Sequence, residues 1–393
     1  MRSKQTRTLS LQLVLNLVVC CSTAAAVTRS LPLPVPTSLH KSQSAAPELA
    51  RPLPAPGRWR GLIGEYGPDN DILLILEKDG KLCALFKRVE FSPLDEVSKN
   101  IFRFPAGGAR AGRQLIFTRD AGGRATRVEV DQIVRKRRQI EPEAGNQLRV
   151  KPLRPVPDLM KEALAAHPPP ETGEFRQTDL VELTKLDPTI RLEIRYATTN
   201  NFLGTVFYSE ARAFMQRPAA EAVVRAHRKL RERGYGLLIH DAYRPWYVTK
   251  VFWDATPDDK KIFVADPAKG SRHNRGCAVD LTLYDLKTKK PVEMVSTYDE
   301  TTDRAYPDYP GGTSLQRWHR RLLRDAMEAE GFTVYEAEWW HFDYKDWQEY
   351  RIGNVTFDRI GSNAVPTTRP GRERVGSFKL SLLPGRYRSR FCN

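Results

Sequence analysis

The sequence predicts an α+β fold preceded by a small all-β module. In residues 179–358, two segments have apolar side chains at helical spacing and end at a glycine. Short apolar runs of strand length lie around them, which is the mixed order of an α+β domain. Residues 59–140 instead contain strand-like runs separated by turn signals, which indicates a small antiparallel sheet or barrel.

Residues 1–26 have the features of a signal peptide. Basic residues precede the apolar run "LSLQLVLNLVVCC", and small residues fit cleavage after Ala26. Polar residues interrupt the run, which is shorter than the ~20 apolar residues of a membrane span. A lipoprotein anchor at Cys20 or Cys21 is less favoured, because Val19 stands where a small residue is expected. We therefore expect an exported protein, periplasmic or extracellular, with no integral membrane span in the mature chain.

Composition restricts the class of protein. The formal net charge is +16, which is compatible with binding to nucleic acid or to an anionic envelope surface, or with a role in solubility alone. Because no basic helix with interleaved aromatics and no zinc-finger pattern is present, we expect no nucleic-acid partner. Cleavage would leave Cys83, Cys277 and Cys392, and this odd number argues against a disulfide scaffold. A single disulfide between two of the three is compatible with the sequence, which does not indicate the pair.

The β-rich module of residues 59–140 contains two turn signals. Asp79-Gly80 divides the apolar run "DILLILEKDGKLCALF", and Gly122-Gly123 divides a later one. The module has no cluster of His, Cys or paired acids, so we interpret it as a structural or wall-binding accessory. Three other segments are rich in proline or basic residues and are predicted as two linkers and a C-terminal tail: residues 27–58, 141–178 and 359–393.

The elements of residues 179–358 follow from periodicity and turn residues. Helices are predicted for residues 217–236 and 315–332. Strands are predicted for residues 235–245, 276–286 and 333–344, after a strand-like alternation over residues 178–198.

The seven histidines differ in their surroundings. His40 and His167 lie in predicted linkers, His227 and His319 on predicted solvated helix faces, and His240 at a predicted core position. That leaves His273 and His341 as candidates for chemistry.

His273, Asp280 and His341 form a candidate zinc site. Asp280 begins a predicted strand seven residues after His273, and Gly276 permits a chain reversal between them. Two histidines and a carboxylate are a ligand set of catalytic zinc, which keeps a fourth position for water. Glu338, in "EWWH", could act on that water as general base and then on the leaving amine as general acid. Because such spacings also occur by chance, an ordinary polar core remains an alternative.

Residues 180–350 resemble the D-alanyl-D-alanine dipeptidase family of zinc peptidases, within a wider group of D,D-carboxypeptidases and peptidoglycan endopeptidases. The resemblance rests on "RYATTNNF", "GYGLLIHDAYRP", "SRHNRGCAVDLTLY", "HRRLLRDAMEAEGF" and "EAEWWHF", which occur in the family's order. It implies a zinc D,D-peptidase fold with a central antiparallel sheet and flanking helices.

The resemblance also implies a role for each matched residue. His273, Asp280 and His341 match the ligands of one catalytic zinc ion, Glu338 the catalytic acid and base, and Arg244 the arginine that stabilises the oxyanion. Tyr196, Ser271 and Asp299 match substrate-contacting positions, with Asp299 as partner for a free ammonium group.

The function expected from this resemblance is hydrolysis of D-alanyl-D-alanine or a related D-dipeptide. A D,D-carboxypeptidase or endopeptidase acting on longer peptidoglycan fragments remains open, as does a wall-binding protein without activity.

Two residues depart from the family's pattern. Val295 replaces a usual glycine near Asp299, and Cys277 stands where a small residue is usual, so its thiol is either packed or a further ligand.

Overall fold

The computed structural model describes residues 50–140 and 149–360, and from Arg51 onward these residues lie in one compact unit. The predicted signal peptide and all but two residues of the predicted basic tail lie outside the described residues. Among the helices that are described, none is long and apolar enough to cross a membrane.

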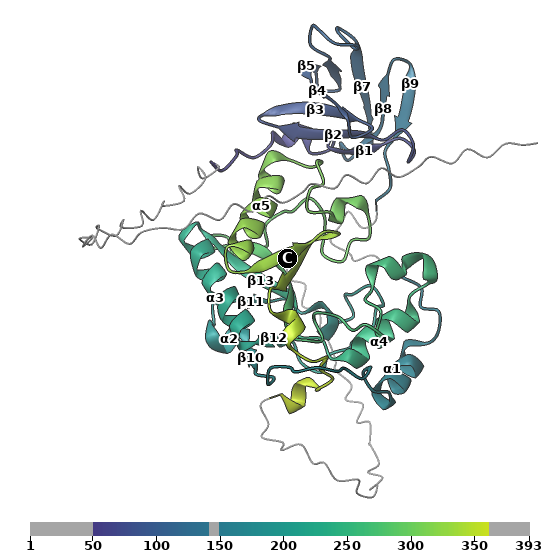
Figure 1. Cartoon of the computed structure of the whole chain (residues 1–393). Helices are drawn as coiled ribbons and strands as arrows, with labels where there is room; N and C mark the ends of the chain where they lie inside the picture. Colours follow the sequence, from purple (N-terminus) through teal and green to yellow (C-terminus); the bar gives the residue numbers. More distant parts are fainter. Residues whose placement is uncertain (1–49, 141–148, 361–393) are drawn as a thin grey trace, which may run out of the picture. The chain divides into compact units, whose positions relative to one another are not determined.

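Residues 64–136 form two antiparallel sheets (Figure 1). Asp79 and Gly80 make the turn between β2 and β3 with φ of 52° and 77°, the left-handed backbone of a two-residue hairpin. The first sheet has the order β1-β2-β3-β4: Gly64–Tyr66, Leu73–Lys78, Lys81–Phe86 and Glu90–Pro93. The second has the order β5-β6-β7-β8-β9: Asp95–Ser98, Ile101–Arg103, Gln114–Arg119, Ala125–Val130 and Ile133–Lys136.

The two sheets share an aromatic core. The rings of Tyr66 and Phe102 lie 6.0 and 5.8 Å from that of Phe117, and all three side chains are buried. Apolar residues at alternate positions of the strands complete this core, which accounts for the alternation in the sequence.

The second half of the chain has a five-stranded sheet of order β11-β13-β14-β16-β15. Neighbouring strands are antiparallel except for β11 and β13, which are parallel. The segment 333–344, predicted as one strand, is a hairpin instead, and residues 178–198 are divided into short elements. The bounds are Arg191–Leu192 (β11), Tyr235–Asp241 (β13), Ala278–Asp285 (β14), Phe332–Tyr335 (β15) and Glu338–Tyr344 (β16), with a separate pair β10 (Leu180–Glu182) and β12 (Phe214–Gln216).

Helices flank this sheet (Figure 1). The two predicted helices are α3 (Arg217–Glu232) and α5 (Ser314–Glu328), and each is followed by a glycine with positive φ, Gly234 and Gly331. The remaining α-helices are α1 (Val156–Ala165), α2 (Leu183–Leu186) and α4 (Trp246–Ala255), and the 3₁₀ helices are η1 (Gly57–Trp59), η2 (Arg195–Ala197), η3 (Asp258–Phe263), η4 (Asp303–Ala305), η5 (Trp347–Glu349) and η6 (Phe357–Arg359).

Several residues lie deeper than the sequence suggests. Helix α1 falls inside the predicted linker 141–178, yet its Leu159 is buried in the core of the second half. His227 and His319, predicted on solvated faces, are buried because their helices also pack on that side. His240 is buried, as predicted. Cys83 and Cys277 are free and buried, and Cys392 lies outside the described residues.

Candidate active site

Two central strands and one loop bring the predicted metal ligands together. Asp280 on β14 lies directly opposite His341 on β16 in the antiparallel register. His273 precedes β14 in a turn, where the N–H of Gly276 donates to the His273 carbonyl at 3.0 Å. Gly276 has a φ of 70°, so the turn needs the left-handed backbone that glycine adopts without strain.

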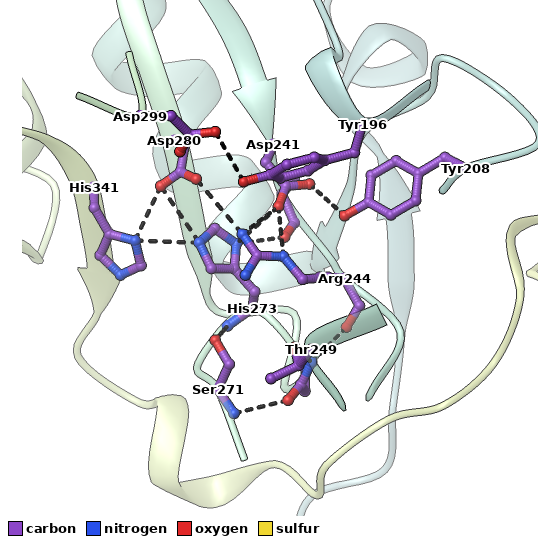
Figure 2. A network of polar contacts seen from close by, with 12 residues as sticks. Tyr196, Tyr208, Asp241, Arg244, Thr249, Ser271, His273, Asp280, Asp299 and His341 are labelled. Atoms are coloured by element: carbon purple, nitrogen blue, oxygen red, sulfur yellow. Dashed lines mark hydrogen bonds and ion pairs between the residues drawn. The ribbon is translucent and has the colours of Figure 1, made fainter. Parts of the chain in front are cut away.

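The three donor atoms form a compact triangle (Figure 2). Nδ1 of His341 lies 2.9 Å from Oδ1 of Asp280 and 3.1 Å from Nε2 of His273. The third side, from Nε2 of His273 to Oδ1 of Asp280, is 3.3 Å. Bonds of ~2.0–2.1 Å to a tetrahedral zinc ion require ligand atoms about 3.3 Å apart, so this triangle fits such an ion.

The second nitrogen of each imidazole is already used. Nδ1–H of His273 donates to the Ala242 carbonyl at 2.6 Å, and Nε2–H of His341 donates to Oδ1 of Asp343 at 3.0 Å. These bonds fix the tautomers and leave one lone pair of each ring directed at the triangle. The donor set therefore suits zinc chemically as well as in its spacing.

Glu338 lies beside the triangle and outside it. Its Oε2 is 3.8 Å from Nδ1 of His341, and the side chain is partly buried. Burial raises the pKa of the Glu338 carboxyl to about 7, and the negative charge of Asp280 adds to the rise. A carboxyl group with this pKa can both accept and release a proton near neutral pH.

Arg244 is held by a buried acid. Its Nε donates to Oδ2 of Asp241 at 2.9 Å, and one NH2 group lies 2.7 Å from the same oxygen. The hydroxyl of Tyr208 donates to the other oxygen of Asp241 at 2.8 Å. The guanidinium also lies over the ring of Tyr196 and 3.8 Å from Asp280, so its direction is fixed before any substrate binds.

Asp299 faces the triangle from a strained loop position. Its φ of 58° is left-handed, which costs a non-glycine residue about 1–3 kcal/mol that surrounding contacts must offset. Its Oδ2 accepts a hydrogen bond from Tyr196 at 3.1 Å. Burial raises the pKa of the Asp299 carboxyl to about 8, and the charges of Asp280 and Glu338 add to this. A cation beside Asp299 would stabilise its charged form.

A cavity of about 390 Å³ connects these groups. All the residues singled out in the sequence line it: Tyr196, Arg244, Ser271, His273, Asp280, Asp299, Glu338 and His341. Ser271 is buried, and its hydroxyl accepts from the His273 N–H at 3.2 Å. Of the two tryptophans in "EWWH", Trp340 lines the cavity, whereas Trp339 points away and donates to Ser296.

The two departures from the family's pattern lie outside the metal triangle. Val295 is not among the cavity-lining residues, and its buried side chain packs with apolar residues of β2 and β3. Cys277 is packed in the core, where burial raises the pKa of its thiol to about 12. Cys277 is not part of the metal triangle and packs among apolar side chains, so of the two alternatives left by the sequence the geometry favours a packing residue.

Three supporting residues were missed in the sequence: Asp241, Tyr298 and Asp343. Tyr298 donates to Oδ2 of Asp280 at 3.0 Å. Asp343 accepts a hydrogen bond from His341, and Asp241 accepts one from Arg244. Asp241 stands directly before "AYRP", and Asp343 is two residues from His341 on one strand, so both positions carried a local signal. Tyr298 lies in a loop and carried none.

Comparison with known proteins places this site in a family. Residues 176–358 match the family model described as D-Ala-D-Ala dipeptidase. The D-alanyl-D-alanine dipeptidase of Escherichia coli K12 is 33% identical over 175 residues, which cover 44% of this chain and 89% of that protein. The chain belongs to the D-Ala-D-Ala dipeptidase family.

Relatives from other bacteria extend this D-Ala-D-Ala dipeptidase match. The D-alanyl-D-alanine dipeptidase of Enterococcus faecium is 34% identical over 40% of this chain and 87% of its own length. That of Streptomyces coelicolor is 31% identical over 44% of this chain and 93% of its own length. As a member of this family, the protein is a zinc-dependent peptide hydrolase. The β strands of residues 64–136 lie outside the family match.

Proposed function

We propose that the protein is an exported zinc dipeptidase that hydrolyses D-alanyl-D-alanine or a related D-dipeptide. The observation that carries this proposal is the arrangement around one cavity, with the metal triangle, Glu338 and Arg244 on its walls and Asp299 facing them. The Asp299 carboxylate at that place suits a substrate with a free ammonium group close to the bond that is cleaved.

His273, Asp280 and His341 would hold the zinc ion through the three atoms of the triangle. When bound, zinc polarises a carbonyl group and makes water a better nucleophile. Glu338 then takes a proton from the attacking water and passes it to the leaving amine. Burial raises the pKa of the Glu338 carboxyl toward neutrality, which suits a group that first accepts and then releases a proton.

Arg244 and Asp299 act on two different groups of the substrate. The Arg244 guanidinium, fixed by Asp241, stabilises the negative charge that develops on the carbonyl oxygen in the transition state. Asp299, oriented by Tyr196, binds the ammonium group and so sets the distance from the amino end to the cleaved bond. A chain that continues beyond that amino group would place an uncharged amide against a buried carboxylate, which is unfavourable.

Export is supported by the basic start, apolar run and small residues of positions 1–26. An exported dipeptidase would act on fragments of the cell wall outside the cytoplasm. Cell fractionation with an antibody to the full chain tests this part separately. Recovery of the uncleaved chain in the cytoplasm would contradict it.

The activity is tested with purified protein, D-alanyl-D-alanine and its N-acetylated form, with metal analysis of the same sample. We expect close to one zinc ion per chain, hydrolysis of the free dipeptide, and loss of activity after chelation that zinc restores. Cleavage of blocked and longer peptides at equal rates would instead assign a carboxypeptidase or endopeptidase. Bound zinc without hydrolysis of any of these peptides would favour the other alternative, a wall-binding protein without activity.

A further inference from the structure

Both faces of the β2–β3 hairpin are buried. On one face, Leu73 and Leu82 belong to the core between the two sheets. On the other, apolar residues of the hairpin form a separate cluster with Val295 and Tyr309. The hairpin sequence is therefore apolar without alternation, which is the pattern of a strand covered on both sides. The cluster contains Leu74, Leu76, Cys83, Leu85, Val295 and Tyr309.

Glu77, at the end of β2, binds the start of helix α5. It is 1% exposed, and its Oε2 accepts from the backbone N–H of Ser314 at 2.7 Å. Its Oε1 accepts from the Ser314 hydroxyl at 3.2 Å, and its carbonyl accepts from Arg317 at 2.7 Å. A carboxylate at this place satisfies a free N–H group of the first helical turn and the positive end of the helix dipole.

A second buried acid holds the chain just before that helix. The hydroxyl of Tyr309 donates to Oε1 of Glu65 at 2.7 Å, and Glu65 is 5% exposed and paired with Arg138. The backbone N–H of Glu77 also donates to the carbonyl of Gly312 at 3.1 Å. Segment 293–313 and the start of α5 are thus attached to the first sheet by apolar packing, by Glu65 and by Glu77.

The same segment carries groups of the active site. Asp299 lies four residues after Val295, and Tyr298 contacts the metal ligand Asp280 through its hydroxyl. Only η4 (Asp303–Ala305) gives the segment regular structure between β14 and α5. The left-handed φ of Asp299 therefore depends on contacts made by its neighbours, and those at Val295 and Tyr309 come from the first sheet.

We propose that the first sheet of the β module is a structural part of the substrate site, because it holds segment 293–313 in the conformation that presents Asp299 to the cavity. This inference rests on the proposed role of Asp299 as the ammonium partner. Glu77 and Tyr309 are positioning residues in this arrangement. They touch neither the cavity nor the metal ligands, and act on the substrate only through the segment.

The test compares Glu77→Gln with Glu129→Gln in the full chain. Glu129 lies on β8 in the other sheet, so it is a matched control for the same chemical change. Both carboxylate oxygens of Glu77 accept hydrogen bonds, and Glu77→Gln replaces one of them with an amide donor and removes the charge. We expect amide hydrogen exchange of residues 296–303 to rise about tenfold, and KM for D-alanyl-D-alanine to rise about as much with kcat little changed. Glu129→Gln should change neither quantity.

Tyr309→Phe is a milder second variant, since it removes only the hydroxyl bonded to Glu65. If Glu77→Gln does not fold, faster exchange of residues 296–303 in Tyr309→Phe supports the inference. Unchanged exchange and KM in a folded variant would overturn it. Equal cleavage of free and N-acetylated dipeptide by the wild type would instead remove the role of Asp299, while the exchange measurement would still report whether the sheet holds the segment.

Discussion

Oδ1 of Asp343 accepts a hydrogen bond from Nε2–H of His341 at 3.0 Å. Its other carboxylate oxygen lies 3.0 Å from Arg272, whose guanidinium stacks on Trp347. Asp343 therefore fixes the tautomer and the ring plane of His341, the proposed metal ligand, from the side remote from the metal triangle. A partner of this kind also makes the ligating nitrogen more basic.

Replacing Asp343 with alanine should weaken zinc binding about 10–100-fold, because His341 would lose its orienting acceptor. Asp343→Asn keeps an oxygen that can accept the same hydrogen bond, so its zinc affinity should lie between those of the wild type and Asp343→Ala. Competition with a chromogenic chelator measures the affinity directly. Asp325→Ala, at an exposed position on α5, serves as the control. Equal zinc affinity of Asp343→Ala and the wild type would show that His341 is oriented by other contacts.

Glu338→Gln should keep the zinc ion and lose at least about 10²-fold in kcat, since it removes proton transfer and leaves the metal triangle intact. Metal content and kcat are measured on the same preparation. His341→Ala is the contrasting variant, and it should lose the metal. Loss of zinc from Glu338→Gln would make Glu338 a ligand instead of a base.

Arg244→Lys should lower kcat about 10²–10³-fold with little change in zinc content. Lysine keeps the charge but cannot direct the planar set of donors that Arg244 fixes through Asp241. The conservative variant is chosen because alanine would leave Asp241 buried without its cation, and the loss of stability would obscure the kinetics. A kcat close to that of the wild type would assign Arg244 to the ion pair with Asp241 alone.

Much of the site could be predicted where the signal was local. The turn at Gly276 and the strand after it follow from residues within one short segment, so the proximity of His273 and Asp280 was predictable. The position of His341 opposite Asp280 depends on the register of two strands 61 residues apart, which spacing alone cannot fix. For that contact the family resemblance supplied what the residues did not.

The elements that the sequence did not predict carry signals that also fit other structures. Helix α1 begins with Val156-Pro157 inside a proline-rich segment, and proline in the first turn favours a helix start as well as a linker. Helix α4 is apolar on most sides, so no amphipathic period marks it. His227 is buried by contacts with Thr189 and Leu237, which belong to other elements, and no pattern within its own helix reveals them.

In the proposed function, a preference for a free amino end depends on Asp299. N-acetylated D-alanyl-D-alanine should be cleaved at least ~100-fold less efficiently than the free dipeptide, because it cannot form the buried ion pair with Asp299; that loss is about 3 kcal/mol, and each 1.36 kcal/mol is a factor of ten. Asp299→Asn should narrow this gap by slowing the free dipeptide more than the blocked one. The ratio of kcat/KM values for the two substrates measures the effect. An unchanged ratio in the variant would place the ammonium group elsewhere.

The stability of the protein should fall with acid because His227 is buried in its neutral form. Nδ1 accepts the Leu237 N–H at 3.0 Å, so protonation would bring two donors together. Burial lowers the pKa of His227 from its ordinary 6.5 to about 4. Between these values the unfolded chain binds the extra proton and the folded chain does not. The contribution, at most about 3 kcal/mol, is therefore complete above pH ~6.5 and is lost progressively toward pH ~4.

Denaturant unfolding at pH 7 and at pH 5 measures this slope for the wild type and for His227→Gln. The variant should be less stable at pH 7, since it loses the bonds of the imidazole to Leu237 and Thr189. The decrease in its free energy of unfolding from pH 7 to pH 5 should be smaller than that of the wild type. The variant lacks the imidazole, whose protonation is suppressed by folding. His167→Gln, at an exposed position, is the matched control and should keep the wild-type slope. Parallel slopes for His227→Gln and the wild type would mean that other groups, such as His319, whose pKa burial also lowers to about 4, cause the acid sensitivity.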